Sequence, residues 1–297
     1  MKTGFIGIVG RPNVGKSTLM NSILGEKIAI ATNKPQTTRN SIRGIYTEPG
    51  DCQMVFIDTP GIHKPKNKLG NYMTDIALSS LKEVDVILFL IDSPMQERAG
   101  GDSFILDKLK NIDTPKILVI NKIDTIEPAV FEETYKAYED LGIFKAIIGT
   151  NALEGKNTDA LLEEIKKYLE EGPQFFPDDM ITDNPMRFLV SEIIREKLLL
   201  YLDDEVPHGV AVEIEQYEEL DALTRIHAVI YCEKQSHKAI IIGKGGKKIK
   251  GVGKSAREEI ESLVGTKVYL ETFVKVKEGW RDSEIAISNF GYHKEEF

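Results

Sequence analysis

The chain has 297 residues, of which 41% are hydrophobic and 29% charged, so it has enough apolar residues for about two folded domains and is not a disordered chain. It has only two cysteines and no apolar run long enough to span a bilayer, so we expect a cytoplasmic protein without a disulfide framework, a signal peptide or a membrane span. The net charge of −9 argues against nucleic acid as a partner of the chain as a whole, but not of a basic region within it.

A glycine-rich turn near the N-terminus is the first pattern with a specific chemical meaning. It reads Gly-Arg-Pro-Asn-Val-Gly-Lys-Ser and lies between an apolar run at 5–9 and a predicted helix at 18–24. This strand–loop–helix context is the one that a phosphate-binding P-loop requires, and an empty βα turn does not explain the lysine and serine. Lys16 is expected on the β- and γ-phosphates and Ser17 on Mg²⁺. The expected nucleotide contacts are Gly10, Asn13, Val14, Gly15, Lys16, Ser17 and Thr18.

The next segments predict a metal-orienting carboxylate at the end of a strand. Residues 32–39 are polar and aperiodic, as in a loop, and the strands at 41–47 and 53–58 should pair antiparallel across a Glu-Pro-Gly-Asp turn. The second strand ends in Asp58-Thr-Pro-Gly61. Alone this is an ordinary turn, but after a P-loop it is typical of a Walker B segment, with Asp58 on Mg²⁺ and the Gly61 N–H on the γ-phosphate.

Helices and strands alternate through the rest of the first domain. The expected helices are 67–82, a segment capped by Asp102, 129–141 and 156–170, and the expected strands are 84–91, 117–120 and 146–148. Repeated βα units predict an α/β fold with a mostly parallel, doubly wound sheet. Such a sheet binds its ligand at the carboxyl ends of the strands.

Asn121-Lys-Ile-Asp124 follows one of these strands and predicts selectivity for guanine. A carboxylate at Asp124 accepts hydrogen bonds from guanine N1–H and its exocyclic amine, a donor pair that adenine lacks. Lys122 would lay its aliphatic stem over the base, and Asn121 would tie this loop to the P-loop. Ordinary capping residues in a βα loop are the alternative.

Taken in order, these motifs resemble those of translation-factor-type GTPases, and three details resemble the Era family. They are the P-loop with Asn13, the Thr37-Thr38-Arg39 loop, and Asp-Thr-Pro-Gly followed by Ile62. The resemblance implies that Thr38 binds Mg²⁺ when the γ-phosphate is present. It also implies that Asn151 and Ala152 contact the base, although Thr150-Asn-Ala departs from the Ser-Ala usual in the family.

The same resemblance predicts slow GTP hydrolysis. Ile62 stands where small signalling GTPases have a catalytic glutamine, and no arginine is clearly placed as a finger, although Arg11 and Arg39 remain candidates. Related GTPases use the P-loop asparagine to hold K⁺, so we expect K⁺ at Asn13, unless that side chain only stabilises the loop. The expected catalytic residues are Lys16, Thr38, Gly61 and Asn13.

A second domain follows a proline-rich joint. We expect a GTPase domain at 1–172, a linker at 173–185 and a KH domain with a C-terminal helix at 186–297. The predicted order is helix 187–202, strands 210–215 and 225–231, helices on both sides of Gly243-Lys-Gly-Gly246, and strand 267–276. This α+β order resembles a type II (bacterial) KH domain, whose Gly-x-x-Gly turn clamps the backbone of single-stranded RNA.

A basic window surrounds this turn. Between residues 236 and 257 the chain has seven lysines and arginines and no acid. A helix–helix turn with a solvated lysine face is the alternative, yet the local charge favours RNA. The expected RNA contacts are Ile241, Ile242, Gly243, Lys244, Gly245, Gly246, Lys247, Lys248 and Lys250, with Ile240 and Ile249 beside them.

The resemblance to the Era family extends over essentially the whole chain, including the joint at 176–198 and Gly279-Trp-Arg. It implies a monomeric GTP/GDP switch that binds the single-stranded 3′ region of small-subunit ribosomal RNA and acts on the pre-ribosomal small subunit, with possible peripheral contact at the inner face of the cell membrane. Two alternatives stay open: a membrane-associated cell-cycle signalling GTPase, and an RNA-binding scaffold with a structural nucleotide.

Overall fold

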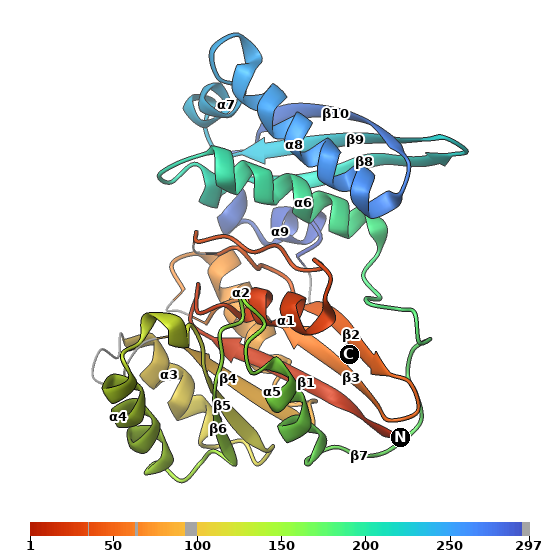
Figure 1. Ribbon diagram of the computed structural model, residues 1–297. Coiled ribbons are helices and arrows are strands. Elements are labelled where there is room, and N and C mark those ends of the chain that lie inside the picture. The colour runs from red at the N-terminus through yellow and green to blue at the C-terminus, as the bar shows by residue number, and fades with distance from the viewer. Residues whose placement is uncertain (35, 63–64, 93–99, 293–297) are drawn as a thin grey trace. The chain divides into compact units, whose positions relative to one another are not determined.

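The protein folds into two compact units, each with its own sheet (Figure 1). The structure is a computed structural model that describes residues 1–34, 36–62, 65–92 and 100–292. One unit comprises Met1–Lys66 and Gly70–Asp183, the other Asn67–Leu69 and Asn184–Phe297. The first has a mostly parallel α/β sheet and the second is an α+β domain, which confirms the predicted fold class.

The sheet of the first unit has the order β2-β3-β1-β4-β5-β6, and β7 pairs with β1. Strands β1, β3, β4, β5 and β6 run parallel, while β2 is antiparallel to β3 and β7 to β1. Every residue of β3, β4 and β5 is buried, because helices cover both faces of the sheet. The strands are β1 (Lys2–Gly10), β2 (Ile42–Glu48), β3 (Cys52–Asp58), β4 (Val86–Ile91), β5 (Lys116–Ile120), β6 (Ala146–Gly149) and β7 (Glu170–Glu171).

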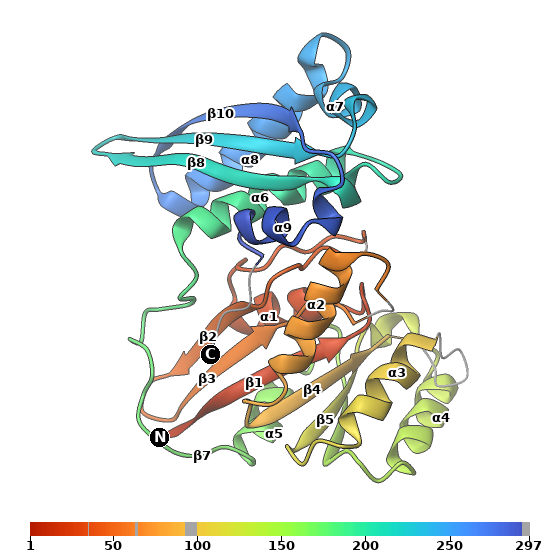
Figure 2. The same cartoon turned by 180° about the vertical axis from the view of Figure 1, so that it is seen from behind.

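Two helices, α1 and α5, cover one face of this sheet, and α2, α3 and α4 cover the other (Figures 1 and 2). On the second face, Ala77, Leu106 and Tyr138 pack against Phe89 of the central strand in one buried cluster. Because β1, β3 and β5 run in the same direction, their carboxyl ends lie at one edge of the sheet. The predicted motifs follow the strands at this edge. The helices are α1 (Lys16–Leu24), α2 (Lys68–Ser79), α3 (Gly100–Leu109), α4 (Pro128–Glu139) and α5 (Thr158–Lys166).

Part of the predicted linker lies against the edge of this sheet. The fully buried side chain of Gln53 accepts hydrogen bonds from the N–H groups of Phe175 (2.8 Å) and Phe176 (2.9 Å), and its amide donates to the Phe176 carbonyl (2.8 Å). Further along, the Ile45 N–H donates to the Ile181 carbonyl at 2.8 Å. Residues 173–183 are thus attached to β2 and β3 instead of forming a free tether.

Replacing Gln53 by alanine should destabilise the first unit by about 1–3 kcal/mol, because it removes the acceptor of the Phe175 and Phe176 N–H groups. Urea unfolding measures the loss, and limited proteolysis should cut the 173–183 segment faster. Gln174→Ala is the matched control, since the exposed Gln174 amide also donates to the Phe176 carbonyl. Equal midpoints for both variants would contradict this role of Gln53.

The second unit is a three-stranded sheet of order β10-β9-β8, in which β9 is antiparallel to β8 and parallel to β10. Helices α6 and α8 pack together on one face (Figure 1), and their core includes Ile194, Ile230 and Val252, all fully buried. The elements are α6 (Met186–Tyr201), β8 (Ala211–Leu220), β9 (Leu223–Cys232), α7 (Gln235–Ile242), α8 (Lys247–Val264), β10 (Lys267–Val276) and α9 (Glu284–Asn289).

The C-terminal segment is held by a tryptophan. Trp280 is fully buried, donates from Nε1 to the Gly209 carbonyl at 2.9 Å, and lies edge-on to Phe290. Ser283 then caps α9 by accepting a hydrogen bond from the Ala286 N–H. A short terminal helix is what the resemblance implied for this region.

Candidate functional site

The loop between β1 and α1 is a tight backbone turn at the edge of the sheet. Gly15 has φ 101°, and a Cβ there would lie 2.3 Å from Asn121 Nδ2, so only glycine fits. Asn13 also has a positive φ, 68°. Because α1 begins at Lys16 without a side-chain cap, its first N–H groups are available to an anion.

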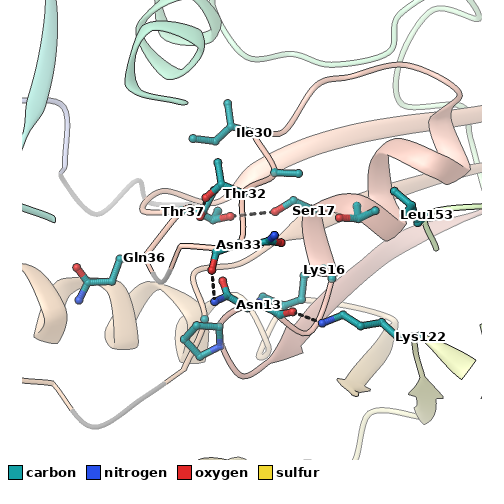
Figure 3. A pocket seen from close by; sticks show the side chains of 16 residues that line it. Asn13, Lys16, Ser17, Ile30, Thr32, Asn33, Gln36, Thr37, Lys122 and Leu153 are labelled. Carbon is teal, nitrogen blue, oxygen red and sulfur yellow. Dashed lines mark hydrogen bonds between the residues drawn. The ribbon is translucent and has the colours of Figure 1, made fainter. Parts of the chain in front are cut away.

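This turn forms one wall of a pocket whose opposite wall is formed by residues 30–33 and 36–38 (Figure 3). The amide of Asn13 donates to the Asn33 carbonyl at 2.9 Å and so links the two walls. Of the expected nucleotide contacts, Asn13, Gly15, Lys16, Ser17, Thr18, Thr38, Gly61 and Lys122 line the pocket. The other lining residues were not among the expected contacts, although Pro12 and Thr37 lie within the sequence motifs; they are Pro12, Ile30, Ala31, Thr32, Asn33, Gln36, Thr37 and Leu153.

Lys16 is a buried cation at the base of this pocket. Its ammonium donates to the carbonyls of Gly10 (3.3 Å) and Arg11 (2.9 Å). Burial lowers the pKa of Lys16 from its ordinary value to about 8, although the charges of Asp58 and Asp92 oppose the shift. Phosphate oxygens would supply the negative charge that the buried ammonium needs.

Nucleotide affinity should therefore fall as the pH rises above about 8. Above that pH, Lys16 is neutral in the free protein and must take up a proton to pair with phosphate, so the association constant should decrease by up to about tenfold per pH unit. Calorimetry between about pH 7 and pH 8.8, in buffers of different ionisation enthalpy, measures both the affinity and the proton uptake. An affinity that does not change over this range would contradict the low pKa.

Three oxygen-bearing side chains meet beside Lys16. Ser17 Oγ donates to Asp58 Oδ2 at 2.6 Å, and Thr38 Oγ1 lies 3.0 Å from Ser17 Oγ and 3.3 Å from Asp58 Oδ2. Burial raises the pKa of Asp58, while Lys16 and the hydroxyls of Ser17 and Thr38 lower it. Asp58 Oδ1 is buried and accepts no hydrogen bond within the described part of the chain. These hard oxygen ligands and the unsatisfied buried carboxylate oxygen fit Mg²⁺ or its bound water.

The segment after Asp58 passes close to the P-loop. A Cβ at Gly61 would lie 2.7 Å from Pro12 Cα, so the backbone of Gly61 reaches the pocket without a side chain. Ile62 is fully buried in the core, so its side chain can neither reach nor orient a water molecule. Neither candidate arginine lines the pocket: Arg11 pairs with Asp92 and Asp102, and Arg39 is buried.

The loops after β5 and β6 meet around Asn121. Its amide donates to the Val14 carbonyl (2.9 Å), and its Oδ1 accepts from Thr150 Oγ1 (3.1 Å) and from the Ala152 N–H (3.0 Å). Lys122 donates to the Asn13 carbonyl at 2.8 Å (Figure 3). Asp124 is exposed in the short 3-10 turn Ile123–Thr125, one turn further on.

The last of these loops differs from the expectation. The Ala152 N–H, expected to face the base, donates to Asn121 instead, and Asn151 Oδ1 accepts from the N–H groups of Leu153 and Glu154. Both residues therefore organise the loop. The side chain that lines the pocket here is Leu153, which is 85% exposed, and neither its type nor its spacing marks it in the sequence.

In the second unit, Gly243, Gly245 and Gly246 all have positive φ and form the turn between α7 and α8. A Cβ at Gly243 would lie 2.7 Å from Lys248 Cβ, so the turn is too tight for a side chain there. α8 starts directly after Gly246 with no side-chain cap and no acid in its first turn. Lysines at a helix N-terminus oppose the helix dipole, so this end of α8 favours an anionic ligand.

The exposed basic side chains of this turn are Lys244, Lys247 and Lys250, with Lys248 half-buried. Ile240 is 42% exposed, and Ile242 and Ile249 are partly buried. Ile241 is different: its side chain is fully buried in the core of the second unit, because the helix turns it towards the sheet. Ile241 therefore anchors α7 to the core of the second unit and is not part of the proposed RNA surface.

No helix in the described part of the chain is both long enough and apolar enough to cross a membrane.

Comparisons with known proteins agree with this geometry. The chain matches the family described as 50S ribosome-binding GTPase over residues 5–122 and the KH domain family over residues 205–281. It is 57% identical to GTPase Era of Alkaliphilus metalliredigens and 55% identical to that of Clostridioides difficile, in each case over 98% of this chain and 99% of the relative.

Solved structures of Era superpose over the same length. A variant of Aquifex aeolicus Era bound to GDP and AlF4⁻ has a TM-score of 0.93 at 43% identity, and Era in complex with MgGDPNP and nucleotides 1506–1542 of 16S ribosomal RNA has 0.94 at 42% identity. Each comparison covers 98% of this chain and 99% of the solved one. With both domains matched in order and at this identity, the chain belongs to the GTPase Era family.

Proposed function

We propose that this GTPase binds GTP and GDP with Mg²⁺ in the pocket at the edge of the first sheet, and that it is a switch that controls binding of ribosomal RNA by the second unit. The observation that carries the nucleotide assignment is that the buried Lys16 ammonium lies beside the cluster of Ser17, Thr38 and Asp58 oxygens. The Era complexes with MgGDPNP and with GDP and AlF4⁻ support it.

Several residues at the pocket have a part in the proposed phosphoryl transfer. Backbone N–H groups of the P-loop and the Lys16 ammonium bind the phosphate chain, and Gly61 offers its N–H to the γ-phosphate. Ser17, Thr38 and Asp58 would hold Mg²⁺, which supplies charge neutralisation to the phosphates. Ile62 is buried, and neither Arg11 nor Arg39 lines the pocket, so none of these three described residues can serve as a water-orienting glutamine or an arginine finger at the γ-phosphate. Intrinsic hydrolysis is therefore slow.

Asn13 is the proposed K⁺ ligand. It lines the pocket and already contacts the Asn33 carbonyl, so a cation at this place would bind oxygen atoms of both walls and supply the positive charge of an absent arginine finger. GTP turnover should be faster in K⁺ than in Na⁺, and Asn13→Ala should remove the difference. Asn111→Ala, an exposed asparagine on the same domain, is the control. Equal wild-type rates in the two salts would refute the K⁺ site.

The proposed RNA ligand is the single-stranded 3′ region of small-subunit ribosomal RNA, bound at the glycine turn and lysines of α7 and α8. The Era complex with nucleotides 1506–1542 of 16S ribosomal RNA supports this ligand, as does the uncapped basic end of α8. The protein would act as a cytoplasmic monomer on the pre-ribosomal small subunit, with peripheral contact at the inner face of the membrane.

The experiment that tests this function measures RNA affinity in each nucleotide state. GTP ordering of Thr38 and Gly61 would change the loops beside the pocket, so RNA carrying the 3′ sequence should bind more tightly with a GTP analogue than with GDP. Crosslinking to ribosomal RNA maps the contact. Identical affinity in both states would refute the switch. Binding to anionic liposomes but not to RNA would favour the membrane-associated signalling GTPase.

A further inference from the structure

An acidic residue outside the nucleotide motifs connects two of them. Asp92 directly follows β4, and its carboxylate lies 2.7 Å (Oδ2) from Lys122 Nζ and 3.2 Å (Oδ1) from Arg11 Nη2. Each oxygen therefore pairs with one cation, Arg11 from the P-loop and Lys122 from the loop after β5. No sequence motif identifies Asp92, because its two partners are distant along the chain.

The two cations differ in their other contacts, so they do not depend equally on Asp92. Arg11 is also held by Asp102 of α3, whose side chain is only 2% exposed, with Nε to Oδ1 at 2.8 Å. Lys122 has a second contact too, the Asn13 carbonyl at 2.8 Å. Arg11 therefore has another strong anionic partner, whereas Lys122 pairs with one carboxylate, Asp92, among the ion pairs of the described residues.

A lysine stem that covers a base must be held in one conformation. Lysine loses a large amount of rotamer freedom when it is ordered, and Lys122 is 40% exposed, so burial alone does not fix it. An ammonium fixed between Asp92 and the Asn13 carbonyl orders the stem before the base arrives, and a binding site ordered in advance binds more tightly.

We propose that Asp92 is a positioning residue for guanine binding. It acts by holding the Lys122 ammonium against the Asn13 carbonyl of the P-loop. The inference rests on the proposed role of Lys122 over the base. It assigns to Asp92 a part of the affinity that depends on the base, and none of the affinity for the phosphates.

A double-mutant cycle tests this assignment. GTP affinity is measured for wild type, Asp92→Ala, Lys122→Ala and the double variant, and each is also tested with Mg²⁺-tripolyphosphate, which lacks the base. Asp92→Ala should weaken GTP binding about tenfold and leave tripolyphosphate binding unchanged. The double variant should bind GTP no more weakly than Lys122→Ala alone, because Asp92 acts through that lysine.

Two variants complete the design. Asp92→Asn keeps the shape but removes the charge, and it should reproduce most of the loss if Asp92→Ala folds poorly. Asp107→Ala, an exposed acid of α3 paired with Lys110, should have no effect. Additive losses in the cycle, or equal losses for GTP and tripolyphosphate, would overturn the proposal for Asp92 alone. A Lys122→Ala variant that binds GTP normally would overturn the proposed role of Lys122 and, with it, this one.

Discussion

Replacing Asp124 by asparagine should weaken GTP binding by about 10²–10³-fold and create measurable binding of xanthosine triphosphate. In the proposed role, the Asp124 carboxylate would accept hydrogen bonds from guanine N1–H and the exocyclic amine, whereas an asparagine amide would offer a donor where guanine also has one. Xanthine has a carbonyl at that position, so it accepts the new donor. Competition of both nucleotides against a fluorescent guanine nucleotide measures the exchange.

The control for this change is Asp140→Asn, another exposed aspartate of the same unit, at the end of α4. It should bind GTP as wild type does. A variant at Asp124 that loses affinity for both nucleotides equally would show a damaged loop rather than altered base recognition. Unchanged GTP affinity would remove Asp124 from the site.

Reversing the charge of Lys247, Lys248 and Lys250 to glutamate should weaken RNA binding by about 10²–10³-fold, the second large effect. These lysines begin α8 directly after the glycine turn, where phosphates would lie. Loss of three phosphate contacts should also lower the slope of log affinity against log salt by about 2. Filter binding with single-stranded RNA at several salt concentrations measures both values.

A second triple variant makes the same change of charge elsewhere. Lys108 of α3, Lys110 directly after α3 and Lys136 of α4 are exposed on the first unit, and their replacement by glutamate should leave most RNA affinity intact. GTP turnover should be unchanged in the α8 variant. Equal RNA loss in both triple variants would mean that total charge, and not the α8 surface, controls binding.

The sequence predicted the parts of the fold that follow from periodicity and from local turn chemistry. Apolar runs such as residues 86–91 are buried on both sides between helices, so they could be predicted as strands of a mostly parallel, doubly wound sheet. Boundaries were less accurate where tertiary contacts decide them. The helix expected at 156–170 ends at Lys166, because Glu170 and Glu171 pair with the start of β1. A register shift between Ile214 and Gln216 breaks the alternation of β8. The alternating pattern therefore stopped at residue 215, although the strand continues to Leu220.

The site was predictable where one residue type has one chemical use. Lys16, Ser17 and Asp58 meet as their motifs require, since the P-loop follows β1 and Asp58 ends β3, which pairs with β1 in parallel. Contacts between loops were not predictable from spacing. Leu153, Asn33 and Asp92 belong to no recognised motif. Only the fold brings Leu153 and Asn33 to the pocket wall and Asp92 to Lys122. For the same reason the sequence could not show that Ile241 faces the core.

The most direct test of the account is titration calorimetry of the purified, nucleotide-free protein with Mg²⁺-GTP and Mg²⁺-ATP. The account predicts that one GTP binds per chain, that ATP gives no measurable heat, and that Lys16→Ala removes the GTP signal. Binding of ATP as tight as that of GTP, or GTP binding that survives loss of the Lys16 ammonium, would contradict the assignment of this pocket to a guanine nucleotide.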